Sequence, residues 1–159
     1  MEDEPDAIEG EPMLIERDEA LPELDHELYN DFLSRVDVQG VAIQALKCEF
    51  IRAAFDSAGG DISFEIHMEC LRDEDADGEF VAVGTVRVKA KSKKTRRICK
   101  RIDCTMEGRY RVNGEFDEAM LAHFERNALF NLWPYLREAI HESSIKMDGP
   151  QFILPLLRL

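Results

Sequence analysis

The hydrophobic period of this sequence changes along the chain, and this change constrains the fold more than any other feature. "DISFEIHMEC" (residues 61–70) alternates apolar and polar side chains at every step, as a strand with one buried face does. "FVAVGTVRVKA" and "RICKRIDCTMEGRYRV" alternate in the same way, and "VAIQALKCEFIRAAF" alternates with a change of parity that predicts a β-bulge. After Gly114 the apolar residues recur every three or four positions as far as "MDGP", which predicts a long helix.

The order of these segments predicts an α+β domain over residues 41–159. Four alternating strands joined by short polar links predict a four-stranded antiparallel β-meander with one buried face. The long helix, interrupted by Pro134, is expected to pack on that face. The last segment, "QFILPLLRL", is expected to be extended, because Pro155 prevents a helix there.

The first 40 residues differ in charge from the rest of the chain. They hold 14 of the 33 Asp and Glu residues but only 2 of the 20 Lys and Arg residues, a net charge of -12 out of -13. Residues 1–20 are too acidic and too poor in aromatic side chains to fold alone, so they are predicted to form a mobile arm. Residues 21–40 predict an amphipathic helix with an apolar stripe made of Leu21, Leu24, Leu28, Phe32 and Val36.

Composition excludes several classes of protein. No run approaches the roughly 18 apolar residues of a membrane span. The acidic start has no basic region or apolar segment of a signal peptide, so a cytoplasmic location is predicted. The four cysteines, Cys48, Cys70, Cys99 and Cys104, form no C-x-x-C pair and are expected to be free thiols in the core. No phosphate-binding loop, nucleophile elbow or metal signature is present, so neither a cofactor nor a catalytic residue is predicted.

Two histidines are candidates for reactive groups. His67 lies between Glu65 and Glu69 on the polar face of a strand, where a solvated face is favoured over a metal site. His123 and Glu125 precede most of the helical pattern and resemble an acid/base pair, but a surface pair or a helix-to-sheet hydrogen bond is favoured.

The basic run "RVKAKSKKTRRICKR" (residues 87–101) spans the turn between the third and fourth strands. Three interpretations stay open: a solvated hairpin whose lysines prevent edge pairing, a docking surface for the acidic arm or another protein, and a contact with nucleic-acid phosphates. The run has no aromatic residue to stack on a base. The candidate partner-binding residues are Lys89, Lys91, Lys93, Lys94, Arg96 and Arg97.

One motif resembles a known family. "LFNLWPYLREAI" followed by "MDGPQFILPLL" is similar to the SecB export chaperones and their SecB-like relatives, whose long helix carries a Phe/Trp-Pro-Tyr-x-Arg-Glu motif before an extended Pro- and Leu-rich segment. The residues that fill this pattern are Trp133, Pro134, Tyr135, Arg137 and Glu138. The resemblance implies a homotetramer (a dimer of dimers) that holds unfolded polypeptides in apolar grooves, without ATP or metal and without enzymatic activity.

The resemblance also implies a set of client-binding side chains. They come from the second strand, the long helix and the last segment: Phe64, Ile66, Met68, Phe130, Leu132, Trp133, Tyr135, Phe152, Leu154 and Leu156.

Three departures from the family bear on its partners. Relatives that deliver clients to the SecA motor use an acidic patch that includes the turn between strands three and four, and here that turn is "KAKSKKTRR", which argues against SecA docking by that route. The sequence shows no counterpart of the C-terminal lid helix, and it adds the acidic arm and helix; we expect the helix (residues 22–36) to cover apolar surface in place of the lid. Solitary SecB-like relatives also serve as chaperones for antitoxins, so both export and antitoxin stabilisation remain open.

Two other classes of protein remain as alternatives to a SecB-like chaperone. One is a nucleic-acid-associated or adaptor protein acting through the hairpin at 87–101. The other is a hotdog-type acyl-thioester enzyme using His123 and Glu125, a reading that leaves the motif around Trp133 unexplained.

Overall fold

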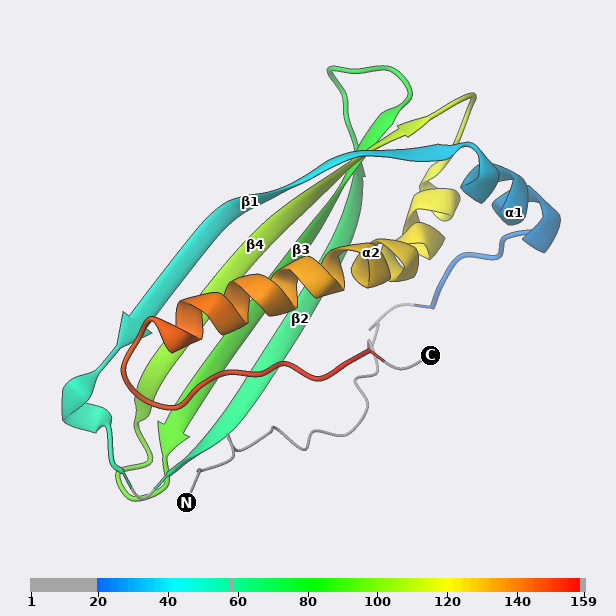
Figure 1. Cartoon of the computed structure of the whole chain (residues 1–159). Coiled ribbons are helices and arrows are strands. Elements are labelled where there is room, and N and C mark those ends of the chain that lie inside the picture. Colours follow the sequence, from blue (N-terminus) through cyan, green and yellow to red (C-terminus); the bar gives the residue numbers. More distant parts are fainter. Residues whose placement is uncertain (1–19, 58, 158–159) are drawn as a thin grey trace.

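A computed structural model describes residues 20–57 and 59–157, and it confirms the α+β class. The elements in chain order are α1 (His26–Ser34), β1 (Val36–Phe50), the short 3-10 helix η1 (Arg52–Ala54), β2 (Gly60–Arg72), β3 (Glu79–Ser92), β4 (Ile98–Val112) and α2 (Glu118–Ile145). The strands form one antiparallel sheet, and α2 crosses one of its faces (Figure 1). The acidic arm expected over residues 1–20 falls almost wholly outside the described residues.

The strand order is β1-β4-β3-β2, so the expected meander holds for β2, β3 and β4 but is wrong for β1. The link between β1 and β2 covers residues 51–59 and contains η1. This link is longer than the two to five residues of a tight hairpin turn. The link therefore carries the chain past the two inner strands, and β1 pairs with β4. This places Ile43 opposite Met106 and Leu46 opposite Cys104, so the apolar side of β1 continues the buried face of β4.

The N-terminal helix is shorter than the predicted range of 21–40. Asp25 caps α1 by accepting hydrogen bonds from the backbone N–H groups of Glu27 (2.7 Å) and Leu28 (3.3 Å). Strand β1 already begins at Val36, which pairs with Val112. The register of β1 against β4 shifts twice, and the shift between residues 43 and 45 confirms the β-bulge that the change of parity predicts.

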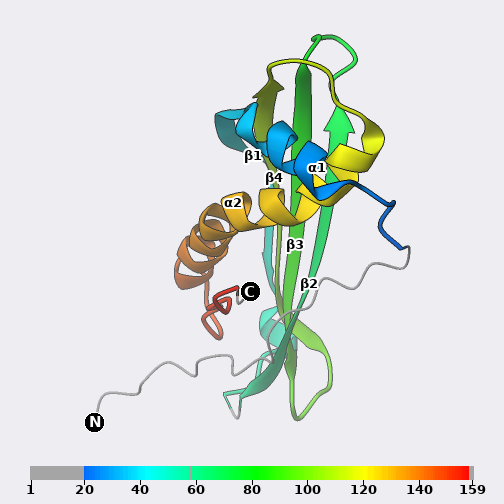
Figure 2. The same cartoon turned by 90° about the vertical axis from the view of Figure 1, so that its right-hand side faces the viewer.

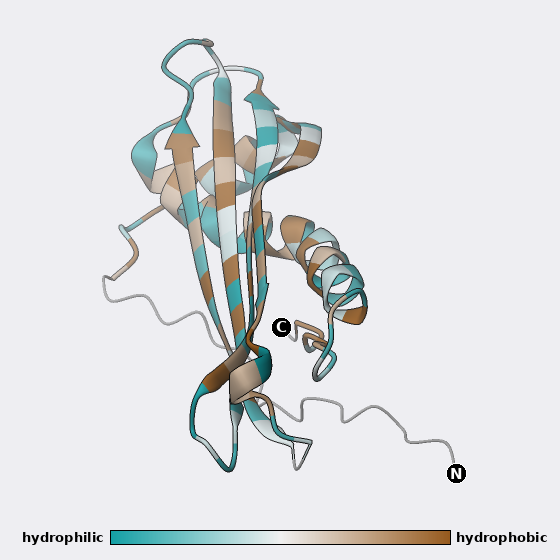
Figure 3. Ribbon diagram, turned by 90° about the vertical axis from the view of Figure 1, so that its left-hand side faces the viewer, coloured by the Kyte–Doolittle hydropathy of each residue, from teal (hydrophilic) through white to brown (hydrophobic). Residues whose placement is uncertain are grey.

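The core lies between α2 and the sheet. Apolar and polar residues alternate along the strands (Figure 3), and the apolar side faces α2, which packs over β2, β3 and β4 (Figure 2). The completely buried strand residues include Val86, Val88, Ile102 and Cys104. Helix α2 changes direction between its first and second halves (Figure 1). Pro134 lies inside it and lacks the N–H that would continue the helical hydrogen bonds, which accounts for a bend.

Helix α1 belongs to the same core. Phe32 is fully buried, and its ring lies 5.9–6.3 Å from those of Phe80, Phe116 and Phe124. The hydroxyl of Tyr29 donates to Asn127 Oδ1 of α2 at 2.9 Å. The N-terminal helix therefore covers an aromatic cluster at the start of α2. None of the helices in the described ranges is long and apolar enough to span a membrane.

Candidate functional site

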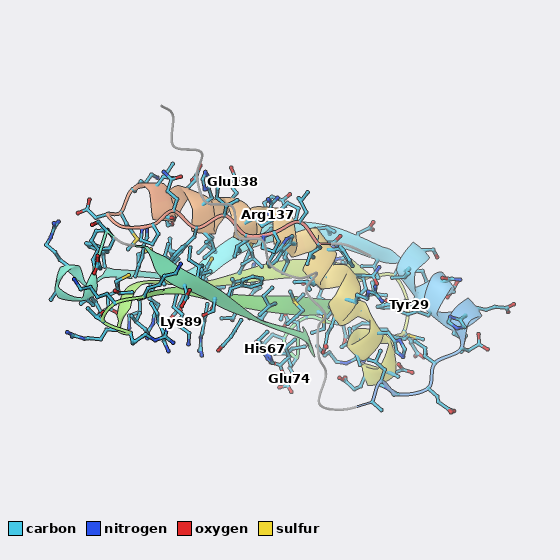
Figure 4. All side chains as sticks on the ribbon, turned by 90° about the horizontal axis from the view of Figure 1, so that it is seen from below. Tyr29, His67, Glu74, Lys89, Arg137 and Glu138 are labelled. Atoms are coloured by element: carbon cyan, nitrogen blue, oxygen red, sulfur yellow. The ribbon has the colours of Figure 1, made fainter. Side chains whose placement is uncertain are left out.

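The C-terminal extended segment (residues 150–157) runs alongside α2 (Figures 1 and 4). A row of side chains from that helix holds it through hydrogen bonds. Three side chains spaced four residues apart lie on one helical face: Trp133, Arg137 and His141. Their contacts are Trp133 Nε1–H to Pro155 O at 2.9 Å, Arg137 Nε–H to Leu154 O at 2.9 Å, and His141 Nδ1 with Phe152 O at 3.3 Å. We call these three residues the donor row; each contacts a carbonyl oxygen of the segment rather than a side chain.

A buried lysine holds the start of the segment. Lys100 of β4 is fully buried, and its ammonium donates to Pro150 O (2.6 Å), Ser144 O (2.9 Å) and Ser144 Oγ (3.3 Å). Burial lowers the pKa of Lys100. Its position at the C-terminal end of α2 supplies a positive charge where the helix dipole is negative. Ser144 Oγ also accepts the backbone N–H of Phe152 at 2.6 Å, so helix, sheet and segment meet at this point.

The apolar side of the segment completes the core. Phe152 and Leu154 are buried, with 0% and 1% exposure, while Ile153 between them is half-buried. The ring of Phe64 on β2 lies 6.5 Å from that of Trp133. Trp133 therefore contacts the sheet with its ring and the segment with its N–H.

The ten client-binding residues expected from the sequence are mostly internal in this structure. Five are buried (Met68, Leu132, Trp133, Phe152 and Leu154), three are half-buried (Phe64, Ile66 and Phe130), and two are exposed (Tyr135 and Leu156). Only Tyr135, 51% exposed, and Leu156, 69% exposed, offer a large surface to a partner. The role of all ten residues in binding clients stays a prediction.

An apolar surface that the sequence reasoning missed lies on β1. Val38, Ile43 and Leu46 are 56%, 48% and 44% exposed, although each faces the same side of the sheet as α2. Helix α2 packs mainly over the other three strands and leaves this side of the edge strand uncovered (Figure 1). The alternation marks the apolar side of β1, but only the strand order shows that it lies at an edge.

The basic hairpin lies at the end of the sheet away from α1 (Figure 1). Lys94 and Arg96 pair with Asp56 (3.9 Å) and Asp61 (3.3 Å). The exposed Lys91, Lys93 and Arg97 form no ion pair within the described ranges, and Lys89 is half-buried. Lys89 and His67 lie on the face of the sheet that α2 does not cover (Figure 4). A polar hollow of about 340 Å³ on that face is lined by Glu65, Arg87, Val88, Lys89, Arg101 and Asp103.

The candidate catalytic residue His123 makes contacts that hold the fold together. His123 Nε2 lies 2.7 Å from Pro22 O, and its ring centroid lies 5.6 Å from that of Tyr29, so this histidine helps to dock the N-terminal helix. No cluster of three or more His, Cys, Asp or Glu residues suited to a metal ion occurs within 20–57 and 59–157.

The four cysteines are free, as expected. Cys70, Cys99 and Cys104 are buried, but Cys48 on the edge strand is exposed, contrary to the expectation of a core position. Burial raises the pKa of Cys104 to about 11.

Comparison with known proteins supports the fold. No protein-family model and no curated protein sequence matches this chain. Among solved structures, the Mycobacterium tuberculosis Rv1957 SecB-like chaperone, in complex with a ChAD peptide from the Rv1956 HigA1 antitoxin, aligns with a TM-score of 0.73 at 16% identity, over 83% of this chain and 98% of that one. A protein of unknown function from Streptococcus agalactiae aligns at a TM-score of 0.45 and 12% identity, over 76% of this chain and 97% of that one, an overlap too weak to support an argument. The chain therefore has the fold of a SecB-like chaperone.

Proposed function

We propose that this protein is a SecB-like chaperone that holds unfolded polypeptides without ATP or a metal ion. One observation carries the proposal: on a SecB-like fold, α2 already binds an extended apolar segment, and it does so through the backbone of that segment. Contacts of this kind suit many sequences, which is what a chaperone for unfolded chains requires.

The proposed clients include antitoxins. The similar M. tuberculosis chaperone is bound to an antitoxin peptide, which supports the same class of client here. The exposed lysines and arginines of the 91–97 turn argue against docking to SecA through an acidic patch. Antitoxin stabilisation is thus favoured over export, and the cytoplasmic location expected from the sequence is kept as part of this proposal.

The proposed assembly is a homotetramer that uses the apolar side of β1. Val38, Ile43 and Leu46 form an exposed apolar strip on an edge strand, where a second copy can add both side-chain packing and backbone hydrogen bonds. Ile43→Lys combined with Leu46→Lys is expected to break the tetramer into smaller species when the mass is measured in solution. An unchanged mass in a folded variant would place the subunit interface elsewhere.

The function is tested by protecting a client from aggregation. The full chain, mixed with a reduced and unfolded client without nucleotide, should suppress light scattering in proportion to its concentration. An unrelated acidic protein of similar size provides the control for non-specific crowding.

A second candidate is an adaptor or nucleic-acid-associated protein, which the exposed Lys91, Lys93 and Arg97 of the hairpin favour. Replacing Lys91, Lys93 and Arg97 by Gln, together with a titration of salt, separates the two. Binding of DNA or RNA that weakens steeply with salt and disappears in this variant would support the second candidate.

A further inference from the structure

Two of the three donor-row contacts between α2 and the last segment follow a simple geometric rule. Residues four apart on a helix are separated by about 6.0 Å along its axis, and two residues of an extended chain span about 6.6 Å. Moving from His141 to Arg137 along the helix accordingly moves the bonded carbonyl from Phe152 to Leu154, two residues on. A helix face with donors at every fourth residue can therefore contact alternate carbonyls of any extended chain lying antiparallel to it.

The segment contributes its backbone and an alternating apolar side. Phe152 and Leu154 point into the core, and their spacing of two residues is that of one side of an extended chain. The third donor, Trp133, contacts Pro155 instead of the next alternate residue. The ligand class that fits is an extended polypeptide with apolar side chains at every second position.

The segment is attached in a way that permits exchange. Within the described ranges, residues 150–157 form no backbone–backbone hydrogen bond with a strand or a helix. Their backbone contacts are instead made with the donor row, Lys100 and Ser144. Release of the segment would break these side-chain contacts and free the N–H of Trp133 without breaking a backbone hydrogen bond of the sheet.

We propose that the donor row of α2 is a backbone-binding site for extended apolar polypeptide, and that residues 150–157 are its intramolecular occupant, which a client segment replaces. This inference rests on the proposed chaperone function and accounts for the N–H of Trp133 being bonded to the chain's own Pro155. An occupant on the same chain is present at a high effective concentration, so it lowers the apparent affinity for clients.

A labelled peptide with the sequence of residues 149–159, GPQFILPLLRL, tests the site directly. A variant with Phe152→Ser and Leu154→Ser releases the occupant, and its affinity for the peptide should exceed that of the wild type by about tenfold or more. Gln151→Ser alters an exposed side chain of the same segment and is the matched control; its affinity should equal that of the wild type. Adding Arg137→Leu to the released variant removes one donor and should reverse most of the gain.

A folded released variant that binds the peptide no more tightly than the wild type would overturn the proposal. If circular dichroism shows that this variant does not fold, hydrogen exchange on the wild type decides the question. The N–H of Phe152 donates to Ser144, so saturating the wild type with an unlabelled copy of the peptide should speed its exchange, and unchanged exchange in the bound state would refute the exchange of occupants.

The test of this binding site and the test of the proposed chaperone function can fail independently of each other. Aggregation suppression without peptide exchange would keep the chaperone and reject this site. Peptide exchange without aggregation suppression would keep the site and reject the chaperone.

Discussion

Replacing Ser144 by alanine should destabilise the protein by much more than loss of one small polar side chain usually does. Ser144 is fully buried, and its Oγ accepts the N–H of Phe152 at 2.6 Å and a contact from Lys100 Nζ at 3.3 Å. Without the oxygen, a buried N–H is left unsatisfied, at a cost of about 1–3 kcal/mol. Alanine regains about 0.5 kcal/mol through its higher helix propensity.

The net loss in the free energy of unfolding is then about 2 kcal/mol once the weaker lysine contact is included. For a chain of this length, a loss of that size lowers the Tm by about 4–8 °C. Urea denaturation followed by circular dichroism measures the free energy, and hydrogen exchange at Phe152 reports whether the segment has loosened.

Ser143→Ala is the matched control, because the neighbouring side chain is half-buried and forms no hydrogen bond within the described ranges. It should change the free energy of unfolding by less than about 0.5 kcal/mol. If Ser144→Ala also changed it by less than about 0.5 kcal/mol, the segment would not depend on this oxygen and the reasoning would be refuted.

Three further perturbations give expectations of the same kind. Gly149→Ala should destabilise the protein by about 1–2 kcal/mol in the same assay, because Gly149 has a φ of +90° and a Cβ there would lie 2.9 Å from Phe50. Gly40→Ala, with open space around the added Cβ, is the control, and equal losses of stability in the two variants would refute the strain at Gly149. Burial raises the pKa of Tyr29 from 10.0 to about 12, so the folded state keeps the hydroxyl proton to a higher pH than the unfolded state, and stability should fall as the pH rises from 10 to 12. Tyr29→Phe should lose less stability over that range, and a pH profile identical to that of the wild type would contradict the raised pKa of Tyr29. Deleting residues 1–34, which spares β1, should increase the binding of a dye specific for exposed apolar surface, because Phe32 leaves the aromatic cluster; unchanged dye binding would reject the covering role of α1.

Much of the fold could be predicted because the spacing of apolar residues in the sequence distinguishes the strands from the helices. Strand β2 alternates without interruption, and α2 keeps its three- and four-residue spacing from its capping residue Asp117 as far as Ile145. The place of β1 could not be predicted in this way, since alternation identifies a strand and its apolar side but not its neighbour. The start of β1 at Val36 was hidden because Val36 also fits the apolar stripe of the preceding helix.

The site was harder to predict for a different reason. The apolar pattern marked Trp133, Phe152 and Leu154, but it could not show that the chain itself covers them. The donor row carried a usable signal, namely polar donors at positions 133, 137 and 141 of one helix followed by an extended segment. Lys100 is in phase with Ile98 and Ile102, so the alternation of β4 places it on the buried side, but its charge and the cations around it in the sequence favour an exposed position.

The most direct test of the account is suppression of aggregation by the intact chain. The purified protein, at one tetramer per client molecule and without nucleotide, should prevent the aggregation of a reduced, unfolded client and release it in a form that can still fold. Absence of protection across several unrelated clients would contradict the account.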